Sequence, residues 1–149
     1  MDKEYDGLIS VEYGTFYLIN FPFVTVDDPR AYVRREGERH WSTTSGVGFR
    51  SGYSDHRAAV HIIWNTTRPP AIDQHPRQTE SFIISSPQLA LMTTLGHPEF
   101  TFPSHHTGRV SVSIQSEGTE EIIRKVQQAP FLSVEGEERW VVNIWPDQD

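Results

Sequence analysis

The segment that decides the fold is RVSVSIQ, residues 109–115, in which polar and apolar side chains alternate without a break. Val110, Val112 and Ile114 occupy every second position, and serine or glutamine fills the positions between and after them. Successive side chains of a β-strand point to opposite faces of its sheet. This period of two therefore predicts a strand with one buried face and one solvated face.

Further extended segments lie on both sides of this strand. They are rich in β-branched and aromatic residues and are separated by glycine, proline or Ser-Asp turns, as in all-β sandwiches and barrels. These predicted strands are residues 8–20, 47–53, 58–64, 79–85, 89–94, 99–102, 131–134 and 139–145.

Four local features refine this prediction. Gly14 interrupts residues 8–20, and a glycine within a strand is typical of a bulge or bend. Residues 47–64 have the pattern of a hairpin with its turn near Ser54. Residues 31–40, rich in arginine and glutamate, predict a solvated loop or short helix, and the proline-rich residues 68–76 predict a loop that crosses between sheets.

One segment, residues 119–128, has a helical pattern instead. Glu120 and Glu121 stand in its first turn, Arg124 and Lys125 stand later, and the apolar residues form a stripe. This charge order is favourable for the helix dipole. We therefore predict a mainly β protein, an antiparallel β-sandwich or open barrel with one short helix near the C-terminus, forming a single domain over residues 1–149.

Composition excludes several classes of function. The 149 residues include no cysteine, which excludes disulfides, thiolate zinc sites and cysteine nucleophiles. The formal net charge of −7 opposes direct binding to nucleic-acid phosphates. The chain contains no apolar run of membrane-spanning length and no apolar leader, so we expect a cytoplasmic protein without membrane contact.

The acidic surplus lies in the C-terminal half. Residues 79–149 carry 10 acidic and 4 basic side chains, whereas residues 1–78 carry 10 and 9. Such a surplus can steer a basic protein partner, although many charge runs are only solvated surface. The candidate partner-binding residues are Trp41, in a polar stretch, and Glu117, Glu120, Glu121, Glu135, Glu137 and Glu138. We expect charge reversal at Glu137 and Glu138 to weaken binding with little loss of thermal stability.

Histidine suggests a competing function. His97, Glu99 and His105, with His106 beside them, offer imidazole and carboxylate groups that suit a divalent metal. The alternative to a binding protein is therefore a β-barrel metal-dependent enzyme or metal-binding protein. Because their spacing matches no ligand signature, we predict no metal ligand, cofactor or catalytic residue. A structural or small-molecule-binding β-sandwich is a third possibility.

Four segments together resemble a known family, the competence protein J-like proteins. They are GLISVEYGTFYL at 7–18, GVGFRSGYSDHRAAVHIIW at 46–64, ESFIISSPQLALM at 80–92 and EFTFPSHHTGRVSVSI at 99–114. The family comprises small nuclease-inhibitor or immunity-type β-sandwich proteins, and its type member inhibits a DNA-entry nuclease.

This resemblance implies a non-catalytic acidic protein that inhibits a nuclease or nuclease toxin by occluding its basic active-site groove. It carries over no binding residue, because the family has no motif to match residue by residue. The arginine-rich residues 30–40 and the predicted helix at 119–128 depart from the family pattern.

Overall fold

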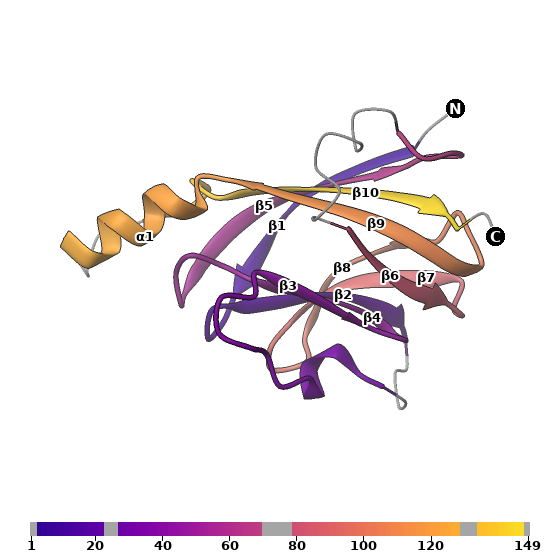
Figure 1. Ribbon diagram of the computed structural model, residues 1–149, viewed down its shortest axis with the longest axis horizontal. Coiled ribbons are helices and arrows are strands. Elements are labelled where there is room, and N and C mark those ends of the chain that lie inside the picture. The colour runs from indigo at the N-terminus through magenta and orange to yellow at the C-terminus, as the bar shows by residue number, and fades with distance from the viewer. Residues whose placement is uncertain (1–2, 23–26, 70–78, 129–133, 148–149) are drawn as a thin grey trace.

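The computed structural model describes residues 3–22, 27–69, 79–128 and 134–147, and it contains two five-stranded sheets that face each other (Figure 1). The first sheet has the order β1-β5-β10-β9-β6, and the second has the order β3-β4-β2-β7-β8. The strands are β1 Lys3–Val11, β2 Thr15–Phe21, β3 His40–Thr43, β4 Gly46–Arg50, β5 His56–Trp64, β6 Thr79–Ile84, β7 Gln88–Thr93, β8 Pro98–Pro103, β9 Gly108–Glu117 and β10 Arg139–Pro146.

The predicted sandwich with one short helix is confirmed. RVSVSIQ lies within β9, and its Val110, Val112 and Ile114 side chains are at most 1% exposed. The helix α1 covers Thr119–Gln128, as predicted. The strand pairs are antiparallel except for β5 and β10, which run parallel.

The core fills the space between the two sheets. Trp140 of the first sheet packs edge-on against Phe16 and Phe49 of the second, with ring centroids 5.7 and 5.5 Å apart. Phe16 and Phe49 stack on each other at 4.6 Å. Each such buried aromatic side chain contributes about 1.5–3 kcal/mol through the apolar area that it removes from water.

One prediction about the strands is confirmed in part and another is wrong. The chain bends at Gly14 as predicted, but the bend is a turn and not a bulge: Tyr13 and Gly14 both have positive φ, and the chain passes there from the first sheet to the second. Residues 47–64 do not form a hairpin, because β4 and β5 belong to different sheets and β4 pairs with β3. Alternation predicts a strand, whereas the partner of that strand is set by long-range packing.

Two further predictions fall largely outside the described residues. Of the predicted strand at 131–134 only Val134 is described, and it lies outside any strand. Of the predicted loop at 68–76 only residues 68–69 are described. The strands on either side of that loop, β5 and β6, belong to the same sheet, so the prediction that it crosses between sheets is wrong.

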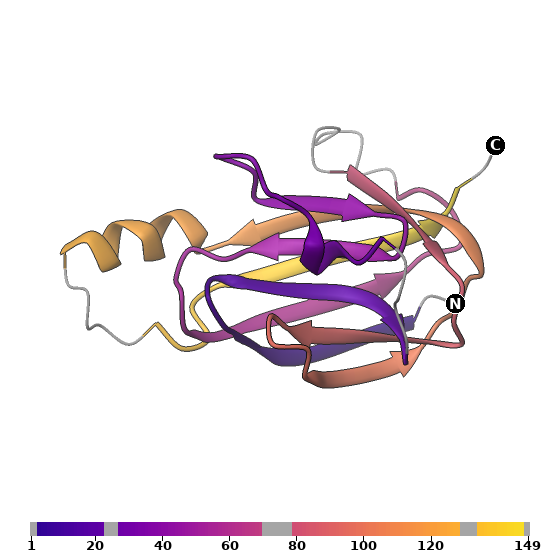
Figure 2. The ribbon, with the colours of Figure 1, turned by 90° about the horizontal axis from the view of Figure 1, so that it is seen from below.

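Helix α1 extends away from one end of the sandwich (Figures 1 and 2). Its first turn adjoins the sheets, and its other end projects outward. Among the described helices, none has the length and apolar character needed to span a membrane.

Candidate functional site

The first turn of α1 attaches the helix to the sandwich. Thr119 and Ile122 are 5% and 1% exposed, and the Ile122 N–H donates to the Gly118 carbonyl. Gly52 lies against this turn so closely that a Cβ there would be 2.7 Å from the Thr119 carbonyl oxygen. Because the buried contacts are confined to the first turn, the following charged residues of α1 remain exposed.

Five of the six candidate glutamates gather around this attachment point. Glu117 and Glu137 lie on either side of Gly118, whose position brings it against the Glu137 backbone. Glu137 also accepts a hydrogen bond from Lys125 of α1. We call this set the acidic end: Glu117, Glu120, Glu121, Glu135 and Glu137, all with exposed side chains.

Three of these glutamates form ion pairs at the surface: Glu120 with Arg39, Glu135 with Arg57 and Glu137 with Lys125. Arg57 Nε donates to Glu135 at 2.9 Å, and this hydrogen bond is the main reason that the pKa of Glu135 lies below its usual value. The Glu137 carboxylate raises the pKa of Lys125 by the same kind of contact. Exposed pairs of this kind contribute about 0–1 kcal/mol each, so the acidic end remains available to a partner.

Glu138 does not belong to this surface. Its side chain is 0% exposed, and its two oxygens accept hydrogen bonds from the Gly52 N–H at 2.8 Å and from Trp140 Nε1 at 2.7 Å. A carboxylate enclosed in this way supports the fold and is not accessible to a protein partner. Glu138 is therefore removed from the candidate binding residues.

Trp41 is also buried, at 4% exposure. Its Nε1 donates to the Pro29 carbonyl at 3.0 Å, and its ring stacks on Tyr32 at 5.9 Å. Gly48 permits this packing, since a Cβ there would lie 2.2 Å from the indole ring. Trp41 thus anchors the described segment 27–39 to the second sheet, which explains an aromatic residue within a polar stretch.

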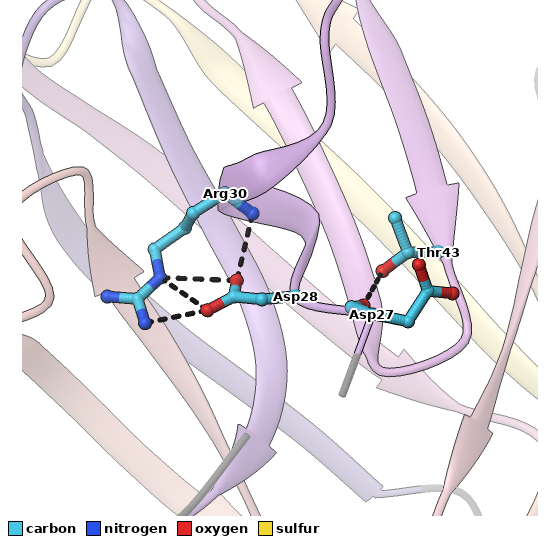
Figure 3. Close-up of polar contacts among 4 residues, drawn as sticks. All are labelled: Asp27, Asp28, Arg30 and Thr43. Carbon is cyan, nitrogen blue, oxygen red and sulfur yellow. Dashed lines mark hydrogen bonds and ion pairs between the residues drawn. The ribbon is translucent and has the colours of Figure 1, made fainter. Parts of the chain in front are cut away.

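Figure 3 shows how the start of that segment is fixed. The Asp28 side chain accepts from the Arg30 backbone N–H and pairs with the Arg30 guanidinium, capping the 3-10 helix η1, Pro29–Ala31. Thr43 donates to the Asp27 carbonyl, and the Thr44 N–H donates to the Asp27 side chain. Helix η1 ends at Ala31, and residues 32–39 contain no helix, so the predicted stretch 31–40 is a mainly exposed loop that leads into β3.

A buried serine, histidine and glutamate lie close to one another below α1. Ser51 Oγ is 2.6 Å from His56 Nε2, and Glu138 Oε1 is 4.0 Å from the same nitrogen. In a hydrolytic triad the carboxylate holds Nδ1 and leaves Nε2 for the serine. Here both groups face Nε2, and all three side chains are buried. The arrangement is a structural network, and sequence spacing gave no signal of it.

The histidines and Glu99 of the alternative metal site do not come together. His97 precedes β8 and His105 follows it, so the strand separates them. The Glu99 side chain accepts from the Ser10 N–H, while His105 Nε2 bonds with the Tyr5 hydroxyl at 2.8 Å. No group of three or more acidic or histidine residues suitable for a metal occurs in the described ranges.

No family model matches the sequence, and no curated protein matches it. Two solved structures resemble the whole chain. One is ComJ from Bacillus subtilis, an inhibitor of the DNA degrading activity of NucA, with a TM-score of 0.60, 10% identity and 99% coverage of both chains. The chain has the ComJ fold. The other, described as crocagin biosynthetic gene J, has a TM-score of 0.61, 11% identity and 99% coverage of both chains, and thus shares the ComJ fold.

Proposed function

We propose that this protein is a non-catalytic inhibitor of a nuclease or nuclease toxin, and that its acidic end occludes the basic groove in which that enzyme binds nucleic acid. The observation that carries the proposal is the gathering of five exposed glutamates around a projecting helix. The fold shared with ComJ, itself an inhibitor of NucA, supports it.

The shape and charge of the acidic end suit this role. Helix α1 has 10 residues and is therefore about 15 Å long, which is sufficient to enter a groove. A nuclease groove must attract phosphates, so complementary glutamates steer the encounter and raise its rate. Sequestration needs no catalytic group, in agreement with the buried position of Ser51, His56 and Glu138.

The test combines the purified protein with the nuclease encoded nearest to its gene. DNA degradation is followed at increasing molar ratio, and affinity is measured by calorimetry at low and high salt. We expect inhibition that is complete near one equivalent and an affinity that falls as salt screens the charges. Full nuclease activity in the presence of excess protein would refute the inhibitor function, whether or not the protein binds the enzyme.

A matched pair of variants tests the surface. Glu121→Gln removes one charge from the acidic end, and Glu36→Gln removes one from an exposed position in the 27–39 segment. We expect Glu121→Gln to weaken binding several-fold, mainly through a slower association rate, and Glu36→Gln to have little effect. Equal affinities of the two variants would remove the acidic end from the proposal while leaving the inhibitor function standing.

A further inference from the structure

Three arginines gather beside the acidic end, and the acidic binding surface does not account for them. The Arg50 backbone N–H donates to the Arg39 carbonyl at 2.8 Å, where the second sheet adjoins the 27–39 segment. Arg34 Nη1 donates to the Glu38 carbonyl at 3.1 Å, next to Arg39. We call Arg34, Arg39 and Arg50 the arginine cluster.

Carboxylates do not neutralise this cluster. Within the described ranges, Arg34 and Arg50 have no acidic side chain within 4.0 Å, and the one such partner of Arg39 is the exposed Glu120 at 3.8 Å. Backbone carbonyls hold the guanidinium groups instead: Arg50 Nη1 donates to the Tyr13 carbonyl at 3.2 Å. Each guanidinium has five N–H donors, so several remain for a ligand.

The arrangement is electrostatically unfavourable without an anion. The pKa of Arg50 lies below its usual value, first because burial disfavours the charge and then because Arg34 and Arg39 are positive. A carboxylate bound among the three groups would offset that repulsion and form charge-assisted hydrogen bonds.

The surroundings favour a protein carboxylate over a nucleic acid. Tyr13, whose carbonyl Arg50 contacts, is 69% exposed, and Leu95 is 59% exposed beside Thr94, which bonds to Glu12. Arginine and tyrosine are enriched at the energetic centres of protein interfaces. The neighbouring acidic end would repel a polyanion that extended beyond the cluster.

One arginine of the cluster and two glutamates of the acidic end line a common pocket. A pocket of about 260 Å³ lies between Arg39 and the first turn of α1, lined also by Glu120, Glu121 and Arg124. We propose that the arginine cluster is a second contact surface, which binds carboxylates of the same protein partner. The partner's face is then basic opposite α1 and acidic opposite the cluster, and this alternation fixes its orientation. This inference rests on the proposed function.

Binding measurements with the nuclease distinguish this proposal from an interface in which the partner's face is uniformly basic. Arg50→Gln removes a charge from the cluster, and Arg109→Gln removes one at the opposite end of β9, where the side chain is exposed. A uniformly basic partner would bind Arg50→Gln more tightly than the native protein. Our proposal predicts several-fold weaker binding of Arg50→Gln and unchanged binding of Arg109→Gln. Tighter or unchanged binding of Arg50→Gln overturns it.

A second experiment needs no nuclease, so its result is independent of the proposed function. The native protein is titrated with a hexaglutamate peptide and, separately, with a short oligothymidylate, while arginine side-chain resonances are followed by NMR. We expect the peptide to perturb the cluster and to bind several-fold more weakly to both Arg50→Gln and Arg39→Gln. Preferential binding of the oligothymidylate, or no perturbation by the peptide, overturns the proposal. Thermal unfolding shows whether each variant is folded, and one folded variant is sufficient for this test.

Discussion

Replacing Glu138 with alanine should destabilise the protein by about 3–4 kcal/mol. The Glu138 carboxylate is fully buried and accepts hydrogen bonds from the Gly52 N–H and Trp140 Nε1. A hydrogen bond to a charged group contributes about 1.5–3 kcal/mol, and the variant leaves both donors buried without an acceptor. For a chain of this length the loss corresponds to a fall of about 10 °C in Tm.

The assay is urea unfolding followed by circular dichroism. Glu138→Gln keeps the side-chain volume and one acceptor oxygen but turns an amide N–H₂ toward one of the two donors. We therefore expect it to lose about half as much free energy of unfolding as Glu138→Ala. Glu137→Gln is the control, because Glu137 is exposed and its pair with Lys125 contributes about 1 kcal/mol or less. A loss below about 1 kcal/mol for Glu138→Ala would refute the argument that the carboxylate satisfies two buried donors.

Charge reversal at both Glu137 and Glu138 would not leave thermal stability nearly unchanged, contrary to the expectation from sequence, because Glu138 is buried. Lysine at position 138 would place an ammonium group against the two N–H donors, inside the core. We therefore expect the double reversal to prevent stable folding, so a loss of binding in that variant would say nothing about the interface. Glu137→Lys alone is the appropriate variant for a binding test.

Three other changes test separate parts of the structure. Gly48→Ala should cost about 1–3 kcal/mol, because its Cβ would overlap the Trp41 ring, and a variant with native Tm would contradict this packing. Ile122→Ala should cost about 2–4 kcal/mol in urea unfolding, because it empties the buried anchor of α1; a negligible loss would show that the helix is not anchored there. Arg57→Gln should raise the pKa of Glu135 in an NMR titration. Because the native pKa of Glu135 is lowered, its pair with Arg57 stabilises the protein above the unfolded pKa, and this stabilisation disappears as pH falls through the folded pKa. The variant lacks the pair and should therefore lose less stability in acid.

The candidate site was predictable in part. Glu117, Glu120 and Glu121 adjoin or belong to a helix whose charge order is visible in the sequence, and they are exposed as expected. Glu138 is buried because it shares the inward side with Trp140, two residues later. That period of two was present in the sequence, but the run of glutamates concealed it.

The arginine cluster could not have been predicted in the same way. Arg34 and Arg39 lie in one arginine-rich stretch, but Arg50 joins them only through the pairing of β3 with β4. The histidine alternative fails for the converse reason. His97 and His105 are near in sequence, yet an extended strand between them holds them apart.

Local patterns in the sequence predicted the helix and most of the strands, but they missed β3 at His40–Thr43. Side-chain alternation and charge order act between residues only a few positions apart, and RVSVSIQ and residues 119–128 both follow them. Only the pairing and packing of the strands show that the chain changes sheet at Gly14, that Trp41 is buried, and that Arg50 joins Arg34 and Arg39 beside the acidic end. Those outcomes depend on packing between two sheets whose strands are distant in sequence, and local patterns carry no information about such packing.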